Sequence, residues 1–187
     1  MPAVSSFMVP LGSPAPDFAL QAIEQTTVSR DDFADAPALL VMFLSNHCPY
    51  VRHLERELGE ALSAYPHLGV VAICSNETDN YPDDAPRYLR EQRARAGWNF
   101  PYLIDETQQV AKDYRAACTP DFFLYDRQGR LAYRGAFDHS TPGNGKPVTG
   151  ELLRAAIDAV LAGGASPEPH QPSVGCSIKW RPENEPA

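Results

Sequence analysis

The sequence lacks three features that would assign it to a specialised class of protein. It has no stretch of about 20 apolar residues, which a membrane-spanning helix requires. Residues 1–10 contain no basic stretch and no long apolar run, so we predict no secretory signal peptide there. Four cysteines among 187 residues are too few for a scaffold held together by disulfides. We therefore expect a cytoplasmic protein that does not bind membranes.

Positive charge is scarce as well. The chain has 16 Lys and Arg against 24 Asp and Glu, a formal net charge of -8. Such a chain repels phosphate backbones, and no local basic cluster offsets this, so nucleic acid is not an expected partner. The 43% of hydrophobic and 21% of charged residues are typical of a globular protein. We expect one domain over residues 1–163 and an extended, Pro-rich tail over residues 164–187.

Apolar runs and helical patterns alternate along the chain. Residues 38–44 and 69–75 are continuously apolar, which predicts two neighbouring parallel strands that are buried on both faces. A helix should follow each of them, the first beginning at Cys48 and the second capped by Asp84-Ala-Pro86 and ending at Gly97. Weaker patterns predict strands at 18–20, 26–29 and 100–105, a short helix near 110–114, a hairpin of 122–125 and 131–134, and a helix at 150–162.

These elements predict an α/β fold, with a central mixed β-sheet, helices on both of its faces and an extra N-terminal hairpin. Two segments lie outside it. Residues 138–149 are rich in Gly and Pro and predict a surface loop. The tail lacks periodicity but carries the sequence GCSIKW, with Cys176 and Trp180, and a disordered tail would seldom hold a tryptophan.

Cys48 stands where the first buried strand is predicted to meet a helix. Unpaired N–H groups and the positive end of the helix dipole favour a thiolate there, so the pKa of this cysteine should lie well below about 8.5. Arg52 lies one helical turn further on and can reach the same face, or it can face water or pair with a glutamate. His47 either shapes the environment of the sulfur or lies at the surface.

Three segments together carry a family resemblance. SNHCPYV after a buried strand, Thr119-Pro120 before DFFLYD, and the entry GSPAPDF resemble the alkyl hydroperoxide reductase/thiol-specific antioxidant branch of thioredoxin-fold proteins. More narrowly, the chain resembles bacterial peroxiredoxin-like thioredoxin-family proteins, whose tails carry a GCSIKW-like segment. The resemblance implies a thioredoxin-like fold, a nucleophilic Cys48 and a cis Thr119-Pro120 bond that faces it. The residues expected to shape the site are His47, Pro49, Arg52, Thr119 and Pro120.

The chain departs from the two best-known patterns of these proteins. Val51 stands where thioredoxins have their second cysteine. Counting back from Cys48, Ser45 and Val41 replace the threonine and proline of peroxiredoxins. The sequence therefore leaves open whether Cys48 attacks a disulfide or a hydroperoxide, because both reactions begin with the same thiolate.

A second thiol is needed to resolve an oxidised Cys48, and three are available. Cys118 is our first choice because it lies two residues before Pro120, although a disulfide requires Cα atoms within about 7 Å. Cys176 in the tail is the reserve partner. Cys118 could instead be a packed loop thiol, and Cys176 could be a bystander without a redox role. Cys74 lies within an apolar strand and is predicted to be structural.

The leading hypothesis is an oxidoreductase, either a thiol-disulfide oxidoreductase or a thiol peroxidase with an antioxidant role. It would act on a protein or small-molecule disulfide or on a hydroperoxide, use no cofactor, draw electrons from an external thiol reductant, and could form a homodimer. The alternative is a redox-inert or copper-handling module of the same fold. Such copper sites need two cysteines at the helix start, and His53 should point to water, so no metal site is predicted.

Overall fold

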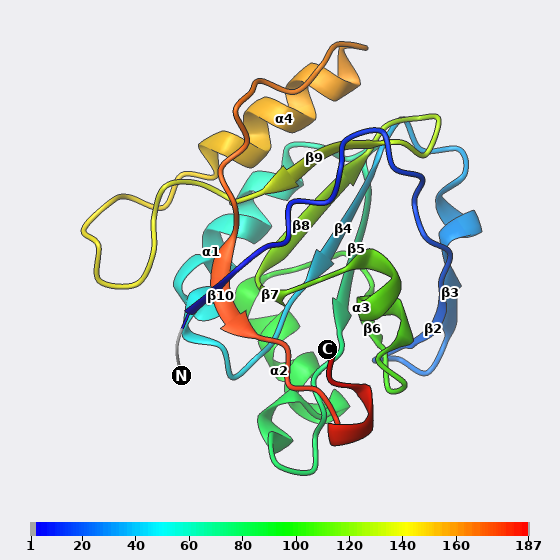
Figure 1. Cartoon of the computed structure of the whole chain (residues 1–187), viewed down its shortest axis with the longest axis vertical. Coiled ribbons are helices and arrows are strands. Elements are labelled where there is room, and N and C mark those ends of the chain that lie inside the picture. Colours follow the sequence, from blue (N-terminus) through cyan, green and yellow to red (C-terminus); the bar gives the residue numbers. More distant parts are fainter. Residues whose placement is uncertain (1–2, 187) are drawn as a thin grey trace.

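The computed structural model describes residues 3–186, which form a large β-sheet, a small one and four α-helices (Figure 1). The large sheet contains β2 (Ala19–Ala22), β3 (Thr27–Ser29), β4 (Leu39–Phe43), β5 (Gly69–Cys74), β6 (Tyr102–Ile104), β8 (Asp121–Tyr125) and β9 (Leu131–Gly135). The small sheet contains β1 (Ala3–Ser5), β7 (Cys118–Thr119) and β10 (Val174–Ser177). The α-helices are α1 (Pro49–Ser63), α2 (Pro86–Ala96), α3 (Gln109–Tyr114) and α4 (Glu151–Leu161), and 3-10 helices lie at Arg30–Phe33, Pro82–Asp84 and Pro182–Asn184.

The large sheet is mixed, as predicted. Its strand order is β3-β2-β6-β5-β4-β8-β9. β4 runs parallel to β5 and β5 runs parallel to β6, whereas β4 pairs with β8 in the antiparallel sense. The hairpins β2-β3 and β8-β9 confirm the two hairpins expected from the sequence. Strand β4 therefore lies near the centre of the sheet, and its C-terminal end carries the chain to Cys48.

Helices cover both faces of this sheet, because the side chains of each central strand alternate between them. In β4, Leu40 and Met42 belong to the apolar cluster that takes in α1, α2 and α4. Val41 and Phe43 belong to the cluster on the other face, which takes in α3. Figure 1 shows α3 on the opposite side of the sheet from α1. The predicted layered α/β architecture is confirmed.

Both ends of α2 can be compared with the sequence-based prediction. The helix ends at Gly97, whose φ of 69° lies in the left-handed region that glycine adopts at little cost. At the other end, Ala85 is the N-cap residue and makes no side-chain capping bond. The predicted capping segment, Asp84-Ala-Pro86, thus does begin the helix, with Pro86 as its first residue. Asp84 itself does not cap it, because its carboxylate is buried and bonds to the segment between β4 and α1.

Residues 174–177 of the tail form β10, the middle strand of the small sheet. Cys176 pairs with Thr119 of β7 on one side and with Ala3 of β1 on the other. β10 also contacts α1. Figure 1 shows this strand, in orange-red, beside the dark-blue start of the chain. Segments from both ends of the described chain thus pair in one small sheet, and β10 brings Cys176 next to Cys48. No helix in residues 3–186 is long and apolar enough to span a membrane.

Candidate active site around Cys48

Cys48 is the N-cap residue of α1, as the sequence predicts. Its backbone is extended, with φ -73° and ψ 120°, and its carbonyl accepts the first helical hydrogen bond from the Arg52 N–H at 3.0 Å. Pro49 occupies the first helical position, where its fixed φ fits the helix and its missing N–H removes no bond. The apolar β4 and this proline together place the sulfur at the positive end of the α1 dipole.

The Cys48 sulfur is fully buried among hydrogen-bonding groups. A hydrogen bond with the Cys176 thiol is the largest influence on its acidity, and burial opposes it. Further hydrogen bonds come from the Thr119 side chain and from the N–H groups of Val51 and Cys176, and the pKa of Cys48 is lowered to about 6. Cys48 is therefore mostly a thiolate at neutral pH, which is the form that attacks disulfides.

Thr119 faces the sulfur with two different groups. The Thr119-Pro120 bond is cis, as expected. The thiol of Cys48 donates to the Thr119 carbonyl oxygen at 3.1 Å. The Thr119 hydroxyl is buried and has no hydrogen-bond partner in the described residues apart from this sulfur, to which it can donate. The carbonyl oxygen can thus accept a hydrogen bond from the protonated sulfur, whereas the hydroxyl can donate one to the thiolate.

Cys176 is the thiol that the fold brings to Cys48. It is almost fully buried, at 6% exposed. Its hydrogen bond to Cys48, its burial and the negative charge of Cys48 raise the pKa of Cys176 well above its ordinary value. The pair therefore shares one proton, which stays on Cys176 while Cys48 carries the charge.

Cys118 lies in the same region but in a different environment. Its thiol donates to the Pro120 carbonyl oxygen at 3.5 Å. Burial, followed by the negative charges of Asp121 and Cys48, raises the pKa of Cys118 well above its ordinary value. Cys74 is buried within β5, where the sequence placed it. Of the three other thiols, Cys176 is the one that hydrogen-bonds to Cys48.

Asp84 anchors the loop before Cys48, and sequence reasoning missed this role. One carboxylate oxygen accepts hydrogen bonds from the backbone N–H of Asn46 at 2.6 Å and of His47 at 3.2 Å. The side chains of Ser45, His47 and Asn76 also bond to the carboxylate. Burial raises the pKa of Asp84, but these bonds, led by that from His47, outweigh it and lower the pKa. No local pattern reveals this anchor, because most of its partners lie far away in the sequence.

His47 is held beside Cys48 by this anchor. Its Nδ1 lies 2.6 Å from the Asp84 carboxylate, and its ring stacks on Tyr81 with centroids 5.1 Å apart. The other ring nitrogen, Nε2, is buried and has no partner within residues 3–186. A carboxylate that bonds one imidazole nitrogen fixes the tautomer and leaves the other nitrogen to take or give a proton. His47 is thus a positioned imidazole next in sequence to the reactive sulfur.

Two other side chains differ from simple expectations. The guanidinium Nε of Arg52 donates to the Asn46 carbonyl at 2.6 Å, so Arg52 helps to anchor the loop before Cys48. His53, which we predicted to point to water, is half-buried. Its Nε2 lies 3.1 Å from the Ser140 hydroxyl, which in turn donates to Asp138. The prediction for His53 was wrong because Ser140, in the segment that follows β9, lies against this side of α1.

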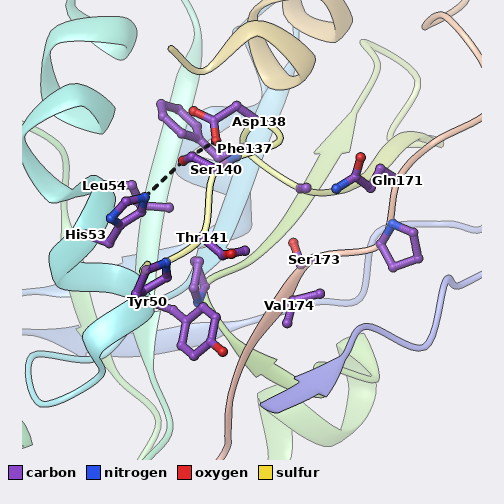
Figure 2. A pocket seen from close by; sticks show the side chains of 14 residues that line it. Tyr50, His53, Leu54, Phe137, Asp138, Ser140, Thr141, Gln171, Ser173 and Val174 are labelled. Atoms are coloured by element: carbon purple, nitrogen blue, oxygen red, sulfur yellow. Dashed lines mark hydrogen bonds between the residues drawn. The ribbon is translucent and has the colours of Figure 1, made fainter. Parts of the chain in front are cut away.

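His53 lines a small cleft beside the site. The cleft lies between α1, residues 136–142 and residues 171–174, and Pro120 contributes to its wall. Figure 2 shows His53 and Tyr50 of α1 on one side, Gln171 and Ser173 on the other, and Ser140 between His53 and Asp138. Its volume of about 30 Å³ is roughly that of one water molecule. The cleft as it stands has room for a small molecule only.

Metal-binding side chains are not clustered here. In the described part of the chain, no group of three or more His, Cys, Asp or Glu residues could hold a metal ion. The Nε2 atom of His139 lies 3.8 Å from the Glu151 carboxylate, and both side chains are exposed.

Comparison with known proteins agrees with the fold described above. A model described as the AhpC/TSA family matches residues 11–134. An uncharacterized conserved protein from Geobacillus kaustophilus is 49% identical, with a TM-score of 0.94 over 97% of this chain and 98% of that chain. The thioredoxin domain of a thiol-disulfide oxidoreductase from Bacteroides vulgatus is 17% identical, with a TM-score of 0.57 over 67% and 88% of the two chains. The fold is therefore thioredoxin-like.

A curated relative from Yersinia pestis carries the name thiol:disulfide interchange protein DsbE. It is 28% identical over 130 residues, which are 68% of this chain. The match spans 65% of that relative's own length, so about a third of the relative has no counterpart in the alignment.

Proposed function

The chain belongs to the AhpC/TSA family, and on this premise we propose that it is a thiol-disulfide oxidoreductase whose nucleophile is Cys48 and whose second thiol is Cys176. One observation carries the proposal. The buried Cys176 lies next to the Cys48 sulfur, in the strand that pairs with Thr119, and its thiol is the main cause that lowers the pKa of Cys48 to about 6. The name of the Yersinia pestis relative, thiol:disulfide interchange protein, supports the same reaction class.

The first step uses the thiolate of Cys48. It attacks one sulfur of the substrate disulfide, a new S–S bond forms, and the other substrate sulfur leaves as a thiolate that takes a proton from solvent. Cys48 is then neutral and bound in a mixed disulfide. The hydrogen bond to Cys48 and the charge on Cys48, two of the three causes that raise the pKa of Cys176, are now gone.

The second step follows from that change. Cys176 can now lose its proton, and its thiolate attacks the Cys48 sulfur, which releases the second substrate thiol. The protein ends with a Cys48-Cys176 disulfide and has given two electrons to the substrate. An external thiol must return these electrons before the next cycle.

Cys176 replaces Cys118 as the first choice for the second thiol. The sequence favoured Cys118 because of its place beside Pro120. In the fold, the Cys118 thiol bonds to the Pro120 carbonyl and has a raised pKa that does not depend mainly on Cys48. Oxidation of Cys48 therefore leaves the largest obstacle to Cys118 ionisation, its burial, in place.

We rank four further proposals below thiol-disulfide exchange. They are peroxide reduction, an antioxidant role, a cytoplasmic location and a homodimer. A hydroperoxide would convert Cys48 to a sulfenic acid, which Cys176 would condense with to give the same disulfide and water. The four free thiols fit a reducing compartment such as the cytoplasm. Sedimentation of the purified protein would test the dimer.

Peptide mapping by mass spectrometry tests the proposed reaction. The reduced protein is treated with one equivalent of hydroxyethyl disulfide or of hydrogen peroxide and then digested without reduction. We expect a Cys48-Cys176 crosslink that persists in Cys118→Ser and Cys74→Ser and disappears in Cys176→Ser, where a mixed disulfide on Cys48 accumulates. A Cys48-Cys118 crosslink would contradict the assignment of the second thiol, and an unmodified Cys48 would support the redox-inert or copper-handling alternative.

A further inference from the structure

The backbone edge next to Cys48 is already occupied by the chain's own strand. β10 pairs with β7 so that Cys176 lies opposite Thr119, whose carbonyl accepts the hydrogen bond from the Cys48 thiol. Without β10, the N–H and C=O groups of β7 would be unpaired, and such an edge accepts an added extended strand. The strand that would otherwise come from a bound polypeptide is supplied here by residues 174–177.

The contact between the two strands is unusually close. A Cβ atom built on Gly175 would lie 2.0 Å from the Thr119 carbonyl oxygen and 3.2 Å from the Pro120 ring. Real Cβ atoms essentially never approach a backbone oxygen as closely as the first of these distances, so only glycine permits this approach. No segment of a second chain can enter between β10 and β7 unless β10 moves away.

β10 is anchored on both sides of Cys176. Before it, the Ser173 hydroxyl donates to the Gly135 carbonyl at 2.6 Å, and the Ser173 N–H donates to the Ser6 hydroxyl at 3.2 Å. After it, the Lys179 N–H donates to the Asn76 side chain at 2.8 Å. These groups are buried, so releasing the strand would leave several polar groups unpaired at once.

We propose that β10 closes this site to polypeptide disulfides, so that Cys48 exchanges with low-molecular-weight disulfides. The inference rests on the proposed function and narrows its substrate class. A small disulfide carries no flanking backbone, so a local opening beside Pro120 that leaves β10 in place is enough for it to reach the buried Cys48 sulfur in line with its own S–S bond. A polypeptide disulfide brings flanking backbone that collides with β10.

Each turnover has the same stoichiometry as the reaction proposed above. The two thiols of the protein become one disulfide, and the small disulfide becomes two small thiols. The oxidant is thus the low-molecular-weight disulfide itself, and the electrons come from the Cys48-Cys176 pair. Because β10 holds Cys176 against Cys48, the same strand that excludes large substrates also resolves the mixed disulfide formed by small ones.

The test compares the rates at which reduced, full-length protein is oxidised by hydroxyethyl disulfide and by insulin, with disulfide formation followed by mass spectrometry. We expect insulin to react at least about 100-fold more slowly, because a locally opened state is populated about 1% of the time or less. In Gly175→Ala, the new methyl group pushes β10 from β7, and the ratio of the two rates should fall about tenfold or more. Gly164→Ala is the matched control, since its added Cβ would lie at an ordinary 3.4 Å from its nearest neighbour.

Ser173→Ala offers a milder second variant if Gly175→Ala does not fold. It removes one anchor, and the rate ratio should again fall while hydrogen exchange of the β10 amides becomes faster. Equal rates with insulin and hydroxyethyl disulfide in the natural protein would overturn the inference and leave the proposed function intact. An unchanged ratio in a variant whose β10 amides exchange freely would overturn it as well. If neither disulfide oxidises Cys48, the proposed function itself fails.

Discussion

The acidity of Cys48 depends on a residue that lies far from it in the sequence. The largest cause is the hydrogen bond with Cys176, and the Thr119 side chain adds a second bond. The helix dipole, from which we predicted an acidic thiol, is a feature of every helix start and does not by itself distinguish this cysteine. The lowering of the pKa to about 6 makes the thiolate the major form of Cys48 at pH 7.

Replacement of Cys176 by alanine should therefore raise the pKa of Cys48 towards its ordinary value. Because the thiolate loses its main donor, the pH at which it forms moves up, and the thiolate at pH 7 changes from the major form to a minor one. Cys176→Ser, whose hydroxyl can still donate, should show a smaller shift. The measurement is the ultraviolet absorbance of the thiolate against pH, with Cys48→Ser as the blank and Cys74→Ala as the control. Equal midpoints in Cys176→Ala and the natural protein would contradict this account.

Sequence reasoning located some of these residues and not others. Cys48, Pro49, Thr119 and Pro120 stand next to clear strand or helix boundaries, and the fold brings them together. The sequence alone could not decide between Cys176 and Cys118 as the second thiol, because the choice depends on where a short, non-periodic strand pairs. Distance along the chain favoured Cys118, whereas the register of β10 against β7 places Cys176 at the sulfur.

At the level of elements, the loop between β4 and α1 is fixed from outside. The loop contains no helix or strand of its own, and the Asp84 carboxylate satisfies the N–H groups of Asn46 and His47. Asp84 belongs to the 3-10 helix before α2, so the position of Cys48 depends on how that element docks. The buried Asp84 carboxylate thus connects the 3-10 helix before α2 to the loop at the start of α1.

Asp84→Asn should destabilise the reduced protein by about 3 kcal/mol or more, because several charge-assisted bonds are lost and an amide N–H group then faces backbone donors. Asp83→Asn is the matched control. The Asp83 side chain is exposed, and its replacement should change the free energy of unfolding by less than about 0.5 kcal/mol. Urea unfolding of the two variants and the natural protein measures both values. A loss of stability that is equal in the two variants would show that the carboxylate does not anchor this loop.

On the scale of the whole molecule, the large sheet was predictable and the small sheet was not. β4 and β5 are continuous apolar runs between turn residues, and α1 shows its helical period clearly, so pattern alone places them. β1 and β7 have three and two residues, and β10 reads VGCS, which is too short and too polar to predict a strand. These three strands exist because they pair with one another.

Oxidation should stabilise the whole protein if Cys48 and Cys176 form a disulfide. The bond would close a loop that spans most of the chain. A cross-link that closes so long a loop lowers the entropy of the unfolded state, which stabilises the folded protein by up to about 4–5 kcal/mol. Urea unfolding of the oxidised and reduced forms gives the difference, and Cys48→Ser should show none. An oxidised form that is less stable than the reduced one would mean that the bond is strained and strongly oxidising.

The small sheet also sets an order of events during biosynthesis. Cys48 and the strands that surround it leave the ribosome early, and proteins begin to fold as they are made. Within residues 3–186, β10 is the last strand to be synthesised, so until it emerges, Cys48 has neither its covering strand nor its proposed partner thiol. The nascent chain therefore presents an open nucleophile to large disulfides that the finished protein is expected to exclude, and completion of the last strand is the moment at which this reactivity changes.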